Sequence, residues 1–261
     1  MTFRLIATDL DGTLLRSDGT VSERTRAALA QAHARGIEIV ITTGRPFRIV
    51  GQIAAAVGVC DVAICANGAI VIDLATGSVL EHRPLAPPVA ARIVEGLRAA
   101  CPGILFSFEF PHEYAREQAY HDTFRPPLAP RHADALELAQ QPVTKLLARH
   151  PTLPFAEVLQ AARAVAGAVA VATTAGGTSI EISAAGVTKA TALAAHCAQR
   201  GIAAADVIAF GDAPNDLALL AFAGRSVAVA NAQPEVLAAA DERTLSNDED
   251  GVAVVVEAAL H

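Results

Sequence analysis

The amino-acid sequence predicts a doubly wound α/β core with a second, α+β unit inserted into it. Short apolar runs alternate with Ala-rich helical stretches near both ends of the chain, as in a parallel sheet covered by helices. Two of these runs end in pairs of aspartates, Asp9 with Asp11 and Asp212 with Asp216. Buried strands of an open α/β sheet end in this way where they open into a binding site. Between the two runs, clustered strands beside two helices indicate a separate unit of about a hundred residues.

The first elements follow from apolar runs separated by helix caps and turns. Ser22 is a good N-cap, Gly36 suits the end of the helix that follows, and Pro46 suits the first turn of the next helix. Asp18-Gly19 lies between two short apolar pairs and predicts a small hairpin. In order we expect strand 3–8, hairpin 14–21, helix 22–36, strand 37–42, helix 46–58, strand 61–65, and strands 70–73 and 79–82.

The rhythm changes near Pro84, and the α/β pattern returns at Val187. In between, Lys145 lies in a predicted strand, where we expect it to pack along its stem with its charged end at the surface. The inserted unit is expected to hold a helix ending at 100, strands 104–110, 143–148, 168–173 and 179–183, a helix at 155–166, and an irregular stretch at 111–142. After it we expect a helix to 199, strand 206–210, a helix after 216, strand 226–230, and helices after Pro234 and Gly251.

Composition and charge exclude several classes of function. The 261 residues are 52% apolar, enough for a sizeable core, and the net charge of −7 argues against binding to nucleic acid or an anionic membrane. The first carboxylate, Asp9, comes too early for a secretory signal, and the longest uncharged run is a poor membrane span. The four cysteines show neither Cys-x-x-Cys nor zinc spacing, so we expect reduced thiols and a cytoplasmic protein.

Asp9 and Asp11 stand one residue apart at the end of a predicted buried strand, followed by Gly12. Their side chains can address one small volume, where one carboxylate acts as nucleophile and the other carries a proton. Gly12 allows the sharp turn that the chain then needs. The alternative is that Asp-Gly marks only a turn at the end of the strand.

The second acidic group, Gly211-Asp212-x-x-Asn215-Asp216, also follows an apolar strand and precedes a helix. We therefore expect Asp212 at the same sheet edge as Asp9. Four carboxylates at one edge repel one another, and at about 4 Å each pair costs roughly 4 kcal/mol in a medium of effective dielectric constant near 20. A hard divalent cation relieves this repulsion, and oxygen ligands without a nearby histidine indicate Mg²⁺. On its own, this motif is also compatible with a capped loop.

Donors for an anionic group accompany these carboxylates. Thr43 and Gly44 follow the second strand and offer a hydroxyl and a backbone amide. Lys189 lies in the first turn of a predicted helix, where its charge adds to the positive end of the helix dipole. Only two of the twenty basic residues are lysine, so a lysine here indicates that a compact positive charge is needed. The alternative is a surface lysine, which a helix start disfavours.

The chain resembles the haloacid dehalogenase-like (HAD) hydrolase superfamily in four motifs, which are Asp9-Leu10-Asp11-Gly12-Thr13, Thr43-Gly44-Arg45, Lys189, and Gly211-Asp212-x-x-Asn215-Asp216. The placement of the inserted unit resembles the Cof-type branch with a C2 cap. This resemblance covers nearly the whole chain. It implies a Rossmann-like parallel core of residues 1–82 and 184–261 and a cap of residues 83–183. Ala190 and Ala230 depart from the family pattern, in which glycine is usual at both positions.

The resemblance implies a role for each motif. Asp9 would attack phosphorus and form an aspartyl-phosphate, and Asp11 would protonate the leaving alkoxide and then activate water. Mg²⁺ would be held by Asp9, the carbonyl oxygen of Asp11 and Asp212, with Asp216 bound directly or through water. Two alternatives stay open for Arg45, which are contact with the phosphate or the cap, and hydrogen bonds to backbone at a helix start. The groups that would hold the phosphoryl oxygens are Thr43, Gly44, Lys189 and Asn215.

Together these features predict a Mg²⁺-dependent phosphatase for small phosphate monoesters, with sugar phosphates foremost. A sugar phosphomutase and a non-catalytic phosphosugar-binding protein stay open as alternatives. The core would set the chemistry, and the cap would set which ester is accepted. The expected partner is a small-molecule phosphate ester, without nucleic acid or membrane, and the expected state is a monomer or weak homo-oligomer.

Overall fold

The structure is a computed structural model that describes residues 3–121, 129–174 and 179–261. Contacts divide the chain into two units, each with a sheet and a hydrophobic core of its own. The first unit comprises Met1–Arg45, Ile49–Glu81 and Thr188–His261, and the second comprises Pro46–Arg48 and His82–Val187.

The sheet of the first unit has the strand order β14-β13-β12-β1-β2-β3-β4-β5. Strand β1 lies at its centre, and the strands from β14 to β3 run parallel to their neighbours, whereas β4 pairs with β3 in the antiparallel sense. The fold class predicted from the sequence is thereby confirmed. The strands are β1 (Leu5–Asp9), β2 (Glu38–Thr42), β3 (Val62–Cys65), β4 (Ile70–Asp73), β5 (Val79–His82), β12 (Val207–Gly211), β13 (Arg225–Ala228) and β14 (Glu242–Arg243).

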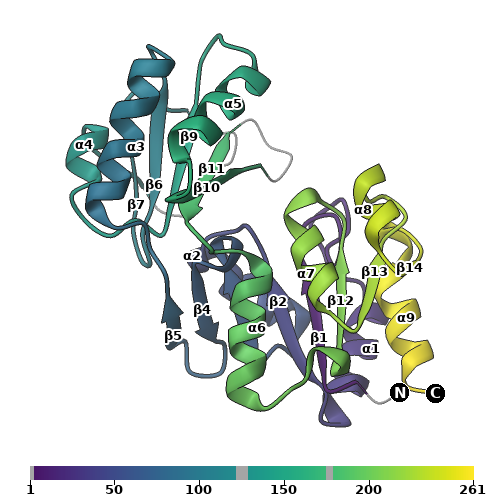
Figure 1. Ribbon diagram of the computed structural model, residues 1–261. Helices are drawn as coiled ribbons and strands as arrows, with labels where there is room; N and C mark the ends of the chain where they lie inside the picture. Colours follow the sequence, from purple (N-terminus) through teal and green to yellow (C-terminus); the bar gives the residue numbers. More distant parts are fainter. Residues whose placement is uncertain (1–2, 122–128, 175–178) are drawn as a thin grey trace. The chain divides into compact units, whose positions relative to one another are not determined.

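Helices cover both faces of this sheet (Figure 1). Successive strand residues point to opposite faces of the sheet. Ile6 therefore packs on the face that carries the helix after Ser22, and Leu5 packs on the face that carries the helix after Thr188. Ser22 caps the first helix as expected, because its hydroxyl accepts a hydrogen bond from the amide of Thr25 at 2.9 Å. One face carries α1 (Glu23–Ala34), α2 (Phe47–Val57) and α9 (Gly251–Ala259), and the other carries α6 (Lys189–Arg200), α7 (Leu217–Phe222) and α8 (Pro234–Ala239).

The chain that leaves β1 differs from the expected hairpin. A turn does form at Arg16–Thr20, where the amide of Arg16 donates to the carbonyl of Thr20 at 2.9 Å. The residues before it do not form a strand, because the amides of Leu14 and Leu15 both bond back to the carbonyl of Leu10, at 3.1 and 2.8 Å. The segment therefore stays folded tightly around the end of β1.

The second unit has a sheet in the order β10-β11-β9-β6-β7-β8, antiparallel except between β7 and β8. Helices α3, α4 and α5 pack on one face of it (Figure 1). The stretch 111–142, expected to be irregular, contains β7, β8 and α4. The elements are α3 (Pro87–Ala100), β6 (Leu105–Glu109), β7 (Tyr114–Arg116), β8 (Arg131–His132), α4 (Ala135–Leu138), β9 (Lys145–Arg149), α5 (Phe155–Ala166), β10 (Ala170–Thr173) and β11 (Ile180–Ala184).

Charged pairs are buried inside the second unit. The expectation that Lys145 holds its charge at the surface is wrong, because its side chain is 3% exposed and its Nζ lies 2.8 Å from Oε1 of Glu181. The segment Pro46–Arg48, which includes the first residues of α2, groups with this unit, and the guanidinium of Arg48 pairs with the carboxylate of Glu109. None of the helices in the described part of the chain combines the length and apolar character needed to cross a membrane.

Candidate active site

Three aspartates meet at the carboxyl edge of the first sheet. Asp9 is the last residue of β1, Asp212 follows β12 directly, and Asp216 ends the short helix η3 (Pro214–Asp216). Because β1 and β12 are parallel neighbours, their ends lie side by side. Each of the three carboxylates offers an oxygen within 4.8 Å of the others, and Asp9 and Asp216 are buried.

Lys189 lies within this group of carboxylates. It is the first residue of α6, a helix that Thr188 caps by accepting from the amide of Thr191 at 3.1 Å. Its Nζ donates to Oδ1 of Asp9 at 2.5 Å and to Oδ1 of Asp216 at 2.6 Å, and its side chain is 1% exposed. The single ammonium therefore joins the strand that carries the first motif to the loop that carries the last.

The electrostatics of the group show an excess of negative charge. Burial raises the pKa of Asp9 well above its usual value, and the charges of Asp216 and Asp212 raise it further, against the opposing effect of Lys189. Burial also raises the pKa of Asp212. Burial alone would lower the pKa of Lys189, but the charges of Asp216 and Asp9 outweigh it and raise the pKa. One lysine does not balance three carboxylates, so the hard oxygen ligands present here fit a divalent cation.

Asp212 is held in place by the loop that follows β1. The hydroxyl of Thr13 donates to its Oδ1 at 2.7 Å. Gly12 has a φ of +77°, and a Cβ at this position would lie 2.6 Å from Oδ2 of Asp212, so a side chain is excluded. No role for Thr13 was predicted from the sequence, because nothing in the local pattern shows which distant carboxylate its hydroxyl reaches.

The loop after β2 is held by hydrogen bonds to its side chains and to the turn after β3. The side chain of Thr43 is buried, and its Oγ1 accepts from the amide of Arg45 at 3.0 Å, which leaves its own hydrogen free to donate. The carbonyl of Thr43 accepts from the amide of Asn67 at 3.0 Å. Asn67 adopts a φ of 58°, and its Oδ1 accepts from Nδ2 of Asn215 at 3.2 Å. Asn67 thus supports two predicted site residues, Thr43 and Asn215, although no role was predicted for it from the sequence.

The side chain of Arg45 pairs with Asp11, a partner that neither of the alternatives from the sequence named. Its Nε donates to Oδ2 of Asp11 at 2.8 Å, and a terminal nitrogen donates to Oδ1 at 2.5 Å. The hydrogen bonds with Asp11, together with the charges of Asp11 and Asp9, raise the pKa of Arg45. The side chain of Asp11 is 54% exposed and lies outside the group formed by Asp9, Asp212 and Asp216.

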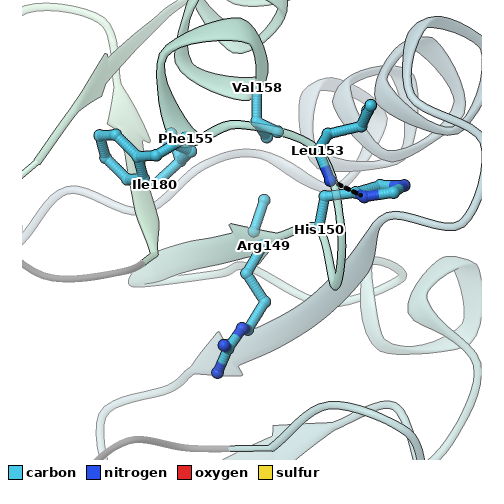
Figure 2. Close-up of a pocket in the computed structure, with 7 residues that line it drawn as sticks. Arg149, His150, Leu153, Phe155, Val158 and Ile180 are labelled. Atoms are coloured by element: carbon cyan, nitrogen blue, oxygen red, sulfur yellow. Dashed lines mark hydrogen bonds between the residues drawn. The ribbon is translucent and has the colours of Figure 1, made fainter.

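Two hollows differ in what lines them. One of about 490 Å³ in the first unit is bordered by Asp11, Gly12, Arg45 and Asn231 among other residues. The other, of about 230 Å³ in the second unit, is lined mainly by apolar side chains between the end of β9 and the start of α5 (Figure 2). Its described lining holds none of the predicted site residues. Of these two hollows, the first is the one bordered by the predicted site residues Asp11 and Arg45.

Comparison with known proteins identifies relatives over nearly the whole chain. The profile of the haloacid dehalogenase-like hydrolases matches residues 6–256. The pyridoxal phosphate phosphatase YbhA of Escherichia coli K12 is 30% identical, over 97% of this chain and 97% of its own. The 5-amino-6-(5-phospho-D-ribitylamino)uracil phosphatase YcsE of Bacillus subtilis 168 is 29% identical, over 97% and 94%. The crystal structure of a haloacid dehalogenase-like hydrolase from Bacteroides thetaiotaomicron matches with a TM-score of 0.82 at 28% identity, covering 98% of this chain and 99% of that one.

Proposed function

The chain belongs to the haloacid dehalogenase-like hydrolase family, and on that premise we propose that it is a Mg²⁺-dependent phosphatase that forms an aspartyl-phosphate on Asp9. It is a phosphoric monoester hydrolase, and it acts on small phosphate substrates. Sugar phosphates are the substrates that we propose first. The observation that carries the mechanism is the buried ammonium of Lys189 between Asp9 and Asp216, beside Asp212.

The reaction divides into two displacements at phosphorus. In the first, a carboxylate oxygen of Asp9 bonds to phosphorus, the bond to the ester oxygen breaks with its electron pair, and Asp11 gives a proton to the leaving alkoxide. In the second, a water oxygen bonds to phosphorus while Asp11 takes its proton. The bond from phosphorus to Asp9 then breaks, which releases inorganic phosphate and restores the carboxylate. Asp11 ends with the proton that it donates in the next turnover.

The remaining groups have proposed roles in binding the cation and the phosphoryl group. Mg²⁺ would be held by Asp9, the carbonyl oxygen of Asp11 and Asp212, with Asp216 bound directly or through water, and when bound it would offset the charges of the carboxylates and the phosphate. Both oxygens of Asp216 already accept hydrogen bonds, Oδ1 from Lys189 and Oδ2 from the amides of Asp212 and Ala213. The groups that we propose to hold the phosphoryl oxygens are the hydroxyl of Thr43, the amide of Gly44, the ammonium of Lys189 and the amide side chain of Asn215.

The second unit supplies none of these groups. All the residues with a proposed chemical role lie in residues 1–82 and 184–261, the segments that we propose as the core. We therefore propose that residues 83–183 form a cap that sets which phosphate ester is accepted. Binding energy from the part of the substrate that does not react is the usual source of such selection.

The substitution Asp9→Asn tests the mechanism. Asparagine is nearly isosteric with aspartate but is a very poor nucleophile, so turnover should fall by about four orders of magnitude or more. Release of inorganic phosphate from a panel of metabolite phosphates measures this and also excludes a mutase, which releases none. Circular dichroism of the variant controls for folding. A variant that keeps a tenth of the native activity would show that Asp9 is not the nucleophile.

A further inference from the structure

We propose that Arg45 is a positioning residue that holds Asp11 in its proton-accepting arrangement for the second displacement, the hydrolysis of the aspartyl-phosphate. This inference rests on the proposed function, in which Asp11 serves first as acid and then as base. A positioning role affects the second displacement, whereas a contact between Arg45 and the phosphate of the substrate would slow the first.

The pair is made by two hydrogen bonds that occupy both oxygens of Asp11. Nε of Arg45 lies 2.8 Å from Oδ2, and the terminal nitrogen lies 2.5 Å from Oδ1. A guanidinium bound side-on to a carboxylate fixes the plane of the carboxyl group as well as its position. Asp11 therefore has one defined orientation although half of its side chain is exposed.

Both partners of the pair are anchored through their backbones. The amide of Arg45 donates to Oγ1 of Thr43 at 3.0 Å, and its carbonyl accepts from the amide of Ala66 at 2.9 Å. On the other side, Nδ2 of Asn231 donates to the carbonyl of Gly12, the residue after Asp11, at 2.7 Å. The guanidinium thus reaches Asp11 from a loop whose backbone is held by hydrogen bonds on both sides of Arg45, as a positioning contact requires.

The chemistry of the contact suits only one of the two steps. Both oxygens of Asp11 accept from the guanidinium, so in this arrangement the carboxyl group is placed to receive a hydrogen from water, and neither oxygen is turned toward a leaving group as a donor. The same pair borders the hollow of about 490 Å³, where water has access to Asp11. For the first displacement, Arg45 must release an oxygen of Asp11. Loss of Arg45 should therefore slow the second displacement and spare the first.

The variant Arg45→Met tests this with p-nitrophenyl phosphate, whose good leaving group needs little help from an acid. In a rapid-quench experiment, release of one equivalent of p-nitrophenolate should keep its native rate within about threefold, and steady turnover should fall by about tenfold or more. The aspartyl-phosphate should then accumulate, and mass spectrometry after acid quench measures it. Arg45→Lys, which cannot bond both oxygens side-on, should show the same pattern to a smaller extent and replaces Arg45→Met if that variant does not fold.

Two controls separate this role from others. Arg225 makes a similar side-on pair with Glu242, at 2.6 and 2.7 Å and with a matching exposure of 26% against 27% for Arg45, so Arg225→Met should leave both phases unchanged. In the Asp11→Asn background, adding Arg45→Met should have no further effect on the decay of the intermediate. A slower first phase without accumulated intermediate would overturn the inference and make Arg45 a phosphate ligand. Activity that survives in Asp9→Asn would instead overturn the proposed function itself.

Discussion

Gly68 and Thr188 approach so closely that a Cβ atom on Gly68 would stand 2.3 Å from the carbonyl oxygen of Thr188. Gly68 ends the short helix η1 (Ala66–Gly68), which follows β3, and Thr188 caps the helix that begins with Lys189. The contact therefore sets the distance between the turn that carries Asn67 and the start of α6. The position of the ammonium between Asp9 and Asp216 depends on this spacing.

Substituting Gly68 by alanine should displace Lys189. The side chain would collide with Thr188, and the φ of +103° at Gly68 disfavours any residue with a Cβ. We expect kcat/KM to fall by about a hundredfold and the free energy of unfolding to fall by about 2 kcal/mol. Gly58→Ala is the matched control, since Gly58 has a φ of +91° with no described atom within 4 Å of an added Cβ. It should lose stability but not activity, and equal activity losses in both variants would contradict this account.

A divalent cation should stabilise the protein. Because the pKa values of Asp9 and Asp212 are raised in the folded state, their ionisation destabilises it as the pH rises through those values, and a bound cation offsets this at neutral pH. Thermal unfolding should shift upward with added Mg²⁺, and excess chelator should abolish activity. Asp212→Asn should unfold at a higher temperature than the native protein without cation, respond less to Mg²⁺ and lose activity.

The charge-matched control for this experiment is Glu235→Gln, which removes an exposed carboxylate of α8 and should keep the native response to Mg²⁺. Ca²⁺ should inhibit, because it prefers more ligands at longer distances than Mg²⁺ and would draw both oxygens of Asp9 away from in-line attack. Full activity in chelator, or equal activity with Ca²⁺, would show that the carboxylate group does not work through a bound cation.

Glu38 should contribute a pH-dependent part of the stability. Burial alone would raise its pKa, but the hydrogen bond with His196 at 2.7 Å and the charges of His196 and Arg200 outweigh burial and lower the pKa below its usual 4.5. A lowered pKa stabilises the fold above pH 4.5, and this contribution is lost as the pH falls through the folded value. Urea unfolding of Glu38→Gln should show a deficit of about 1 kcal/mol or more at neutral pH that shrinks in acid. Because Glu38 begins β2, at the end away from Thr43, kcat should not change.

The second unit should control which ester is accepted. Glu181 and Lys145 lie on the sheet face opposite to Ile182 and Leu146, which pack in the core with the helices. Glu181→Gln should change the ranking of metabolite phosphates by about tenfold and leave p-nitrophenyl phosphate within a few-fold. Glu95→Gln, on the exposed side of α3, is the control and should leave the ranking unchanged. An equal loss on all esters would mean that Glu181 serves the chemistry or the fold instead.

Much of the architecture could be read from local sequence patterns. The strand that leads to Asp9, the cap at Ser22 and the helix with Lys189 in its first turn were predicted, because apolar periodicity and helix caps depend on a few neighbouring residues. The grouping of Asp9 with Asp212 also followed from the sequence, since parallel strands bring their carboxyl ends to one edge. The elements within residues 111–142 were harder to predict from the sequence, because short strands such as β7 are stabilised by partners distant in the chain.

Side-chain partners in the site were decided by the tertiary structure alone. The sequence indicated that Asp9, Asp11 and Asp212 follow strands that end at one sheet edge, and that Lys189 lies in the first turn of a helix, because these positions depend on local patterns. It could not show that Arg45 pairs with Asp11, that Thr13 reaches Asp212, or that Lys145 is buried against Glu181. Each of these contacts joins residues from separate elements, and its geometry depends on how the sheet twists and how the helices pack. Local sequence patterns determine where strands and helices begin and end, whereas the packing of these elements determines which charged side chains contact one another.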